Sequence, residues 1–202
     1  MLKVGLTGSR YSGKSTISDL FRKIKVPVFD SDVILKYILR YDYKVINEIC
    51  NKIGHEYIKN GVFNTDEILA DNKFKDIVKI ASPHILNSYY KFQDKHKGSV
   101  YTIFKSSILF ESGISNKMDK IISINCPLDE RLKRLYIKKS IKDSFMKFDI
   151  EQLLKSENYI DKVNNSDIII YNFGIFDVNN QVKRADNDIV DFYLKSKIKQ
   201  NI

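Results

Sequence analysis

A glycine-rich segment, GSRYSGKS at residues 8–15, lies between the short apolar run 4–6 and a helical pattern of apolar residues. Its spacing is G-x-x-x-x-G-K-[ST], and a strand before it with a helix after it is the setting in which this spacing binds phosphate. Backbone N–H groups turn inward around the anion, the helix adds the positive end of its dipole, and the lysine reaches the β- and γ-phosphates. The alternative is a glycine-rich turn with an exposed lysine, but the agreement of strand, loop, helix and spacing favours phosphate binding.

We therefore predict a nucleotide site on this loop, with the Ser15 hydroxyl as a ligand of Mg²⁺. Lys14 is predicted to hold the phosphates and to take part in catalysis. The predicted nucleotide-binding residues of the loop are Gly8, Ser9, Arg10, Tyr11, Ser12, Gly13, Lys14, Ser15 and Thr16.

Short apolar runs alternate with helical patterns along most of the chain. The runs are rich in β-branched and aromatic residues, are too short for ordinary helices and do not alternate strictly, which is typical of strands covered on both faces. Apolar residues recur at helical spacing between the runs and again near the end of the chain, over residues 178–192. The predicted fold class is α/β, with a parallel five-stranded sheet flanked by helices. The predicted strands are 4–6, 26–29, 100–104, 121–126 and 168–171.

Two stretches interrupt this alternation. Residues 41–97 contain helical spacing but no convincing strand, which predicts a helical insertion after the second strand. Residues 138–158 are highly charged and are predicted to form a lid. No internal repeat and no Gly/Ser-rich or Pro-rich linker separates these parts from the rest. The predicted division is a nucleotide-binding core of residues 1–40, 98–137 and 159–202, a helical insertion of residues 41–97 and a lid of residues 138–158.

Composition excludes several kinds of protein. With 43% hydrophobic residues the chain can bury a core, which argues against disorder, and no apolar run reaches the length of a membrane helix. The first residues lack the features of a secretory signal and the two cysteines are far apart, so we expect a cytoplasmic protein with buried, reduced thiols. The net charge of +9 comes mainly from lysine rather than from the arginine fork that reads bases. We therefore expect no nucleic-acid or membrane partner, and a monomer or weak homo-oligomer.

Asp30-Ser31-Asp32 ends the second predicted strand. The carboxyl ends of the strands line the ligand crevice of a doubly wound sheet, so these carboxylates are expected to face the same cleft as the loop. A base there would accept a substrate hydroxyl proton during phosphoryl transfer, which contributes roughly 10²- to 10⁴-fold in rate. The alternative is a cap on the helix that starts near Val33, a common role of aspartate. The residues alone leave both roles open.

These segments together resemble the dephospho-CoA kinases over most of the chain. The opening LKVGLTGSRYSGKST, the second-strand segment VPVFDSDVI and the stretch NGVFNTDEI resemble family signatures in the same order. SSILFESG at residues 106–113 is similar to the family's PLLFESG, and DKIISINCPLDERLKRL is similar to its fourth strand and following helix. The resemblance implies ATP-dependent phosphorylation of the 3′-hydroxyl of dephospho-CoA, which gives coenzyme A and ADP in the last step of coenzyme A synthesis. It also implies a P-loop NTPase-type core, a helical CoA-binding region and a lid.

The resemblance further implies roles for residues outside the loop. Asp32 falls at the position of the catalytic base that contacts the substrate hydroxyl, and Lys36 takes the place of a family arginine. Phe110 and Glu111 fall where the family builds part of the substrate side. Arg134 and Lys138 are expected to reach the nucleotide from the helix that leads towards the lid, and a solvated helix face is the alternative for Arg134.

Three positions near this predicted site depart from the family's pattern. Ser9 and Tyr11 replace loop glycines, so a positive φ at either residue would carry a steric cost. The proline of PLLFESG is Ser107.

The predicted lid departs from the pattern as well. Its usual arginine and glutamine read Gln152 and Ser156, and activity would be weak unless Lys138, Lys139 or Lys142 supplies the missing charge. The alternatives are therefore another P-loop kinase of a nucleotide or small molecule, and a non-catalytic protein that binds ATP or CoA with a degenerate lid.

Overall fold

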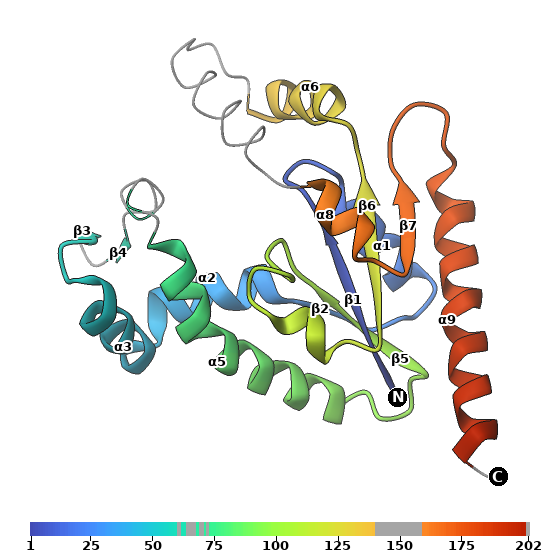
Figure 1. The fold of residues 1–202 in the computed structure, drawn as a ribbon, viewed down its shortest axis with the longest axis horizontal. Helices are drawn as coiled ribbons and strands as arrows, with labels where there is room; N and C mark the ends of the chain where they lie inside the picture. Colours follow the sequence, from blue (N-terminus) through green and yellow to red (C-terminus); the bar gives the residue numbers. More distant parts are fainter. Residues whose placement is uncertain (60–61, 64–67, 69–70, 72, 140–158, 201–202) are drawn as a thin grey trace.

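The computed structural model describes residues 1–59, 62–63, 68, 71, 73–139 and 159–200. At its centre is a sheet of five parallel strands in the order β2-β5-β1-β6-β7 (Figure 1). The five predicted strands are confirmed, each within about two residues of its predicted bounds. They are β1 (Leu2–Gly8), β2 (Val28–Asp30), β5 (Tyr101–Lys105), β6 (Lys120–Asn125) and β7 (Ile168–Tyr171).

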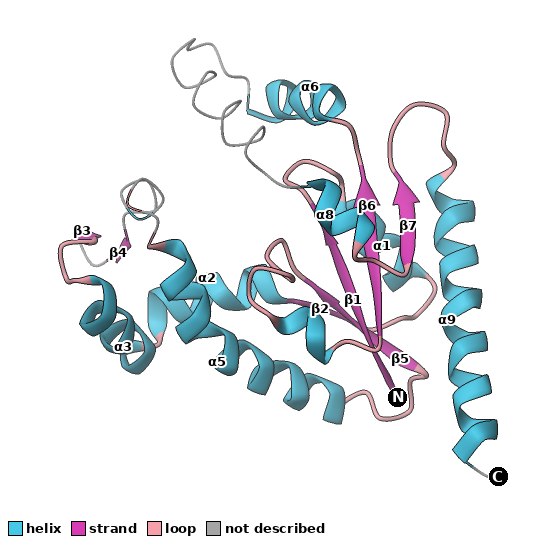
Figure 2. Ribbon diagram, in the orientation of Figure 1, coloured by secondary structure: helices cyan, strands magenta, loops and turns pink. Residues whose placement is uncertain are grey.

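Helices flank this sheet (Figure 2). α1 (Lys14–Lys23) and α9 (Val178–Gln200) contribute to one apolar cluster with the strands, and α2 (Ser31–Tyr41), α3 (Tyr43–Ile53) and α5 (Phe74–Asp94) contribute to a second. Neighbouring residues of one strand belong to different clusters, since Ile103 packs in the first and Phe104 in the second. Both faces of the strands are therefore buried, which explains why their sequences read as continuous apolar runs.

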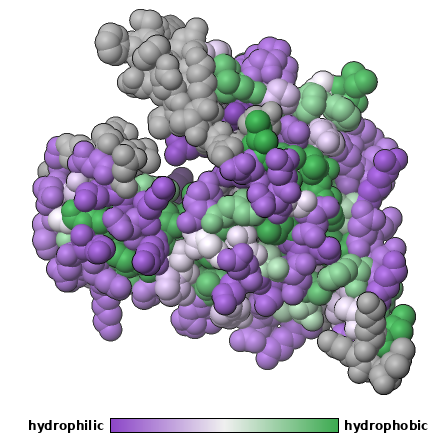
Figure 3. Space-filling model, viewed as in Figure 1, coloured by the Kyte–Doolittle hydropathy of each residue, from purple (hydrophilic) through white to green (hydrophobic). Residues whose placement is uncertain are grey.

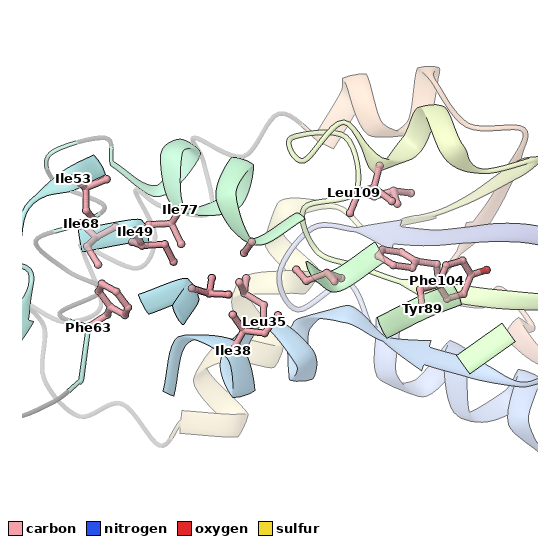
Figure 4. Packing of buried hydrophobic residues seen from close by; sticks show 14 of the residues in the cluster. Leu35, Ile38, Ile49, Ile53, Phe63, Ile68, Ile77, Tyr89, Phe104 and Leu109 are labelled. Atoms are coloured by element: carbon pink, nitrogen blue, oxygen red, sulfur yellow. The ribbon is translucent and has the colours of Figure 1, made fainter. Parts of the chain in front are cut away.

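Between β2 and β5 the chain is mainly helical. α2, α3 and α5 pack around buried side chains that Figure 4 shows, among them Leu35, Ile49 and Ile77. The prediction of no strand in this stretch is wrong, because β3 (Ile58–Lys59) and β4 (Val62–Phe63) form a small antiparallel sheet. Strands of two residues are too short to show the alternation that identifies a strand in a sequence. The predicted bounds of the core, the insertion and the lid stay predictions.

The helix predicted to start near Val33 begins two residues earlier, at Ser31. Asp30 is its N-cap, and the Asp30 carboxylate accepts a hydrogen bond from the backbone N–H of Val33 (3.3 Å). The capping role considered for an aspartate thus belongs to Asp30. Asp32 lies in the first turn of α2, where the helix dipole favours a negative charge.

Three further helices complete the described structure: η1, a 3₁₀ helix (Ile114–Lys117), α6 (Leu128–Lys139) and α8 (Tyr159–Asn164). Residues 140–158, between α6 and α8, lie outside the described residues, and so do the predicted lid residues Lys142, Gln152 and Ser156. The lid therefore stays a prediction.

Hydrophilic residues cover most of the face of the molecule seen in Figure 3. No helix in the described part of the chain has both the length and the apolar character of a membrane span. Cys50 and Cys126 are both free and buried, as expected, and burial raises the pKa of each thiol. Their raised pKa keeps both side chains in the unreactive thiol form at neutral pH.

The position of β5, with a paired strand on each side, gives a prediction about the core. Ile103 is 0% exposed and lies opposite Val4 of β1 and Val28 of β2. We expect Ile103→Ala to lower the free energy of unfolding by about 2–5 kcal/mol, because it removes buried methyl groups and leaves a cavity. The matched control is Ile175→Ala, at a side chain that is 100% exposed. Urea denaturation measures both variants, and equal losses would contradict this account of the core.

Candidate active site

The glycine-rich loop lies at the carboxyl ends of the strands, where β1 leads through residues 9–13 into α1. Beside it is a hollow of about 500 Å³. Four segments of the chain bring residues to this hollow: the loop with the start of α1, helix α2, the segment after β5, and helix α6. The lining residues are Arg10, Tyr11, Gly13, Lys14, Ser15, Thr16, Lys36, Ser107 and Arg134.

Lys14 is buried, at 8% exposed, and it lines the hollow. Its ammonium donates hydrogen bonds to the carbonyl oxygens of Gly8 (2.7 Å) and Ser9 (2.9 Å). The positive charge is therefore held against the loop, at the N-terminal end of α1, where the helix dipole also favours an anion.

Two hydroxyls of the loop are buried without a hydrogen-bond partner within the described ranges. They belong to Ser9 and Ser12. The Thr7 hydroxyl, near the end of β1, is also buried without a hydrogen-bond partner among the described residues. A buried hydroxyl without a partner costs about 1–3 kcal/mol, so such groups are rare in folded proteins. Their concentration beside Lys14 fits a loop that donates hydrogen bonds to a bound anion.

The backbone of the loop requires glycine at one position and tolerates tyrosine at another. Gly13 has φ 96°, and a Cβ there would lie 2.0 Å from the amide nitrogen of Asn172. Of the two residues that replace family glycines, Tyr11 has a positive φ (62°) and Ser9 does not. The cost expected for a positive φ therefore falls on Tyr11 and is about 1–2 kcal/mol.

Arg134 on α6 donates hydrogen bonds to the loop. One guanidinium nitrogen donates to the carbonyl oxygens of Tyr11 (3.2 Å) and Ser12 (3.0 Å), and another donates to the carbonyl oxygen of Asn172 (2.5 Å). The amide of Asn172 also donates to the Ser12 carbonyl oxygen (2.8 Å). A solvated helix face, the alternative considered for Arg134, does not describe this side chain. Its contacts fix the loop rather than face open solvent.

Asp32 is half-buried, and both of its carboxylate oxygens accept hydrogen bonds from Ser107. The Ser107 backbone N–H donates to one oxygen (3.0 Å), and the Ser107 hydroxyl donates to the other (2.6 Å). Ser107 also lines the hollow, so the Asp32 carboxylate is tied to its wall. A proline at position 107 would offer neither donor.

Lys162 on α8 supports the same segment. Its ammonium donates to the carbonyl oxygen of Ser107 (2.8 Å) and forms an ion pair with Glu111 (2.9 Å). Lys162 is 7% exposed, so its buried ammonium needs its partners, although the Glu111 carboxylate itself is exposed. It links α8 to the residue that holds Asp32.

The structure does not bring every predicted site residue to the loop. Glu111 lines a second hollow of about 570 Å³, between α5 and η1, and Phe110 packs against the second apolar cluster. Lys36 is exposed and lines the first hollow, as Thr16 does. Lys138 continues the α6 backbone, but its side chain is not among the described ones.

The surroundings of Ser15 bear on the predicted Mg²⁺. The ammonium of Lys105 lies 3.4 Å from the Ser15 hydroxyl oxygen and 2.6 Å from a carboxylate oxygen of Asp30. Two unit charges about 4 Å apart interact by about 4 kcal/mol at an effective dielectric constant of about 20, and a divalent ion doubles this repulsion. Across the described ranges, no three His, Cys, Asp or Glu side chains gather as metal ligands. This arrangement does not fit Mg²⁺ on Ser15 while Lys105 lies there.

The sequence interpretation missed Lys105 and Lys162. The third predicted strand ends at Phe104, although Lys105 is the last residue of β5 and so lies at the edge where ligands bind. A charged residue directly after a buried run is a signal that identifies such a position. No local signal identifies Lys162, because its partners Ser107 and Glu111 are more than 50 residues away in sequence.

The contacts of Arg134 give a prediction for nucleotide affinity. We expect Arg134→Met to weaken ATP binding by at least about tenfold, because the loop carbonyls lose charged hydrogen bonds that are worth about 1.5–3 kcal/mol each. Lys133→Met is the control, since Lys133 is exposed and pairs only with Glu130 among the contacts described for its ammonium. Calorimetry with ATP measures both affinities. An Arg134→Met affinity within about threefold of the unmodified chain would contradict the role given to the guanidinium.

Comparisons with known proteins agree with this geometry. A family model described as Dephospho-CoA kinase matches residues 2–177. A dephospho-CoA kinase of Fusobacterium nucleatum is 32% identical over 175 residues, which cover 84% of this chain and 88% of the relative.

Two solved structures share the fold. A Thermus thermophilus protein has a TM-score of 0.72 at 17% identity, covering 94% of this chain and 96% of its own. Dephospho-CoA kinase from Campylobacter jejuni has a TM-score of 0.58 at 21% identity, covering 94% of this chain and 97% of its own. The P-loop kinase fold expected from the motifs is thereby confirmed. The chain belongs to the dephospho-CoA kinase family, the kinases that carry out the last step of coenzyme A synthesis.

Proposed function

We propose that this chain transfers the γ-phosphoryl group of ATP to the 3′-hydroxyl of dephospho-CoA, giving coenzyme A and ADP. The observation that carries the proposal is one hollow lined by Lys14 of the phosphate-binding loop and by Ser107, whose N–H and hydroxyl hold Asp32. Family membership supports the choice of acceptor. A nucleotide on the loop and an acceptor hydroxyl at Asp32 then lie on opposite sides of the transferred group.

The loop side of the reaction follows from its charges. The phosphates take hydrogen bonds from the loop N–H groups at the start of α1, and the Lys14 ammonium moves from the Gly8 and Ser9 carbonyls to the β- and γ-phosphates. Arg134 binds the carbonyls of Tyr11 and Ser12, so the Gly13 N–H, on the same peptide bond as the Ser12 carbonyl, is directed away from the guanidinium, whereas the Ser12 N–H donates to the Ser9 carbonyl oxygen (3.2 Å). The loop is therefore organised before the nucleotide arrives, which avoids a reorganisation cost.

The acceptor side follows from Asp32. Its carboxylate receives the proton of the 3′-hydroxyl as the oxygen forms a bond to the γ-phosphorus and the bond to the β,γ-bridging oxygen breaks, which releases ADP. Each carboxylate oxygen has two lone pairs, so one can accept the substrate hydroxyl while Ser107 stays bound. Ser107 thereby acts as a positioning residue.

Further parts of the proposal concern the acceptor's remaining groups. Lys36 lines the loop hollow, and Lys75, Lys79 and Lys117 line the second hollow with Glu111, so both have cationic groups for an anionic acceptor. We assign Phe110 and Glu111 to this substrate side, and Lys138 to the nucleotide side with Arg134. The division into core, insertion and lid belongs to the same proposal. Cytoplasmic location, a monomer or weak homo-oligomer and the lack of a nucleic-acid partner stay predictions.

Mg²⁺ on Ser15, predicted from the motif, is not part of this proposal, because the Lys105 ammonium lies beside that hydroxyl.

A coupled assay with purified full-length chain, ATP and dephospho-CoA tests the function. We expect formation of coenzyme A and ADP in equal amounts. No product above background at high enzyme concentration would reject the proposal, and a panel of other hydroxyl acceptors then separates another P-loop kinase from a non-catalytic protein. Calorimetry in parallel identifies the non-catalytic protein as one that binds ATP but turns over no acceptor.

The proposed role of Asp32 as the base gives a prediction for kcat. We expect Asp32→Asn to lower kcat by at least about 10²-fold and to leave ATP affinity within about threefold, because the amide keeps the shape but does not take the proton. Asp19→Asn is the control, at an exposed carboxylate of α1 that pairs with Arg22. An unchanged kcat in Asp32→Asn would assign Asp32 to the start of α2 alone.

A further inference from the structure

We infer that the ammonium of Lys105 serves as a built-in cation of the nucleotide site, in the place beside Ser15 that the motif assigns to Mg²⁺. The inference rests on the nucleotide-binding part of the proposed function. It concerns how the phosphates are neutralised, and it implies that nucleotide affinity in this chain depends only weakly on Mg²⁺.

The sheet fixes where Lys105 lies. As the last residue of β5, it is opposite Leu6 in β1 and opposite Asp30 in β2. β1 leads directly into the phosphate-binding loop, and Asp30 is the N-cap of α2. Lys105 therefore lies between the two strands that lead to the loop and to α2. Because this register is set by backbone pairing in the central strand of three, the Cα of Lys105 is fixed between these two segments, and its ammonium is held there by Asp30.

The contacts of Lys105 place its charge at the loop hydroxyl. The residue is 7% exposed, and its ammonium lies 2.6 Å from a carboxylate oxygen of Asp30 and 3.4 Å from the Ser15 hydroxyl oxygen. In the G-x-x-x-x-G-K-[ST] motif the hydroxyl at this position binds a metal ion. That metal ion brings positive charge to the β- and γ-phosphates. Lys105 brings such a charge to the same hydroxyl from the protein itself.

Asp30 makes this arrangement difficult for a metal to displace. Its carboxylate caps α2 through the Val33 N–H (3.3 Å) and pairs with the buried Lys105, so a cation that took Asp30 would leave an ammonium buried without its carboxylate. Mg²⁺ also loses its water reluctantly and prefers an octahedral set of oxygen ligands. Asp30 is already paired, and the described residues contain no group of three His, Cys, Asp or Glu side chains that could hold a metal ion.

A purely structural ion pair is the competing explanation. In that case Lys105 would stabilise the junction of β2, β5 and α2, and replacing it would lower stability without changing how nucleotide affinity responds to Mg²⁺. Measuring nucleotide affinity with and without metal separates the two explanations.

Calorimetry on the full chain with ATP alone, once with EDTA and once with excess Mg²⁺, tests the inference. We expect the two dissociation constants of the unmodified chain to differ by less than about tenfold. A difference of about tenfold or more in favour of Mg²⁺ would overturn the inference, and so would the lack of ATP binding under both conditions.

Variants then test Lys105 itself. Lys105→Met should weaken ATP binding in EDTA by at least about tenfold, the loss expected for one charge-assisted hydrogen bond, and added Mg²⁺ should recover most of it. Because this variant leaves Asp30 without its partner, the double variant Asp30→Asn with Lys105→Met removes both charges and should show the same gain in Mg²⁺ dependence. Circular dichroism checks that each variant is folded. A response to Mg²⁺ that matches the unmodified chain in every folded variant would leave Lys105 a structural residue only.

Lys120→Met is the matched control. Lys120 forms a comparable ion pair with Asp167 (2.8 Å), but it is the first residue of β6, at the opposite end of the sheet from the loop. Its ATP affinity should equal that of the unmodified chain under both conditions. These binding measurements contain no dephospho-CoA, so they can succeed where the proposed acceptor fails, and a chain that makes coenzyme A can still fail them.

Discussion

The phosphate-binding loop is held by hydrogen bonds from Arg134 and Asn172, and the rest of the site depends on them. Arg134 and Asn172 donate hydrogen bonds to the carbonyls of Tyr11 and Ser12, and Arg134 also binds the Asn172 carbonyl. A peptide whose carbonyl points outward directs the N–H on the same peptide bond the other way, so these bonds set the direction of the loop's donors. Three parts of the chain, the loop, α6 and the end of β7, thus meet at one guanidinium. The strain of a positive φ at Tyr11 is maintained by the same contacts.

Much of the fold could be predicted because the evidence for it is local. Five runs with both faces buried have a recognisable composition, and the loop spacing identifies where the first strand ends and the first helix begins. The small β3–β4 sheet could not be predicted, because strands of two residues are too short to show the alternation of apolar and polar residues that identifies a strand. The start of α2 was misplaced for a related reason. Asp30 and Asp32 both suit a cap, and only the backbone geometry separates them.

The chemistry of the site was only partly accessible from sequence. Lys14 and Asp32 could be named, one from a motif and the other from a resemblance. The partners that position Asp32 could not, because Ser107 is 75 residues away in the chain and Lys162 is a further 55 residues beyond. The ion pair of the buried Lys162 ammonium with the exposed Glu111 carboxylate depends on the arrangement of a loop and a short helix, which no periodic pattern encodes. Such contacts matter because a buried ammonium is stable only where its partners meet it.

The hydrogen bonds of Ser107 restrict how the Asp32 carboxylate can rotate. With N–H and hydroxyl both engaged, the Asp32 carboxylate is fixed in rotation and its two oxygens are no longer equivalent to an incoming hydroxyl. The oxygen that faces the backbone N–H lies against the protein, whereas its neighbour meets a hydroxyl that can rotate about its own C–O bond. In the proposed reaction the acceptor alcohol would bind a free lone pair of that second oxygen, beside a donor that can rotate to make room. Ser107, which takes no proton itself, thus makes the two oxygens of the proposed base inequivalent.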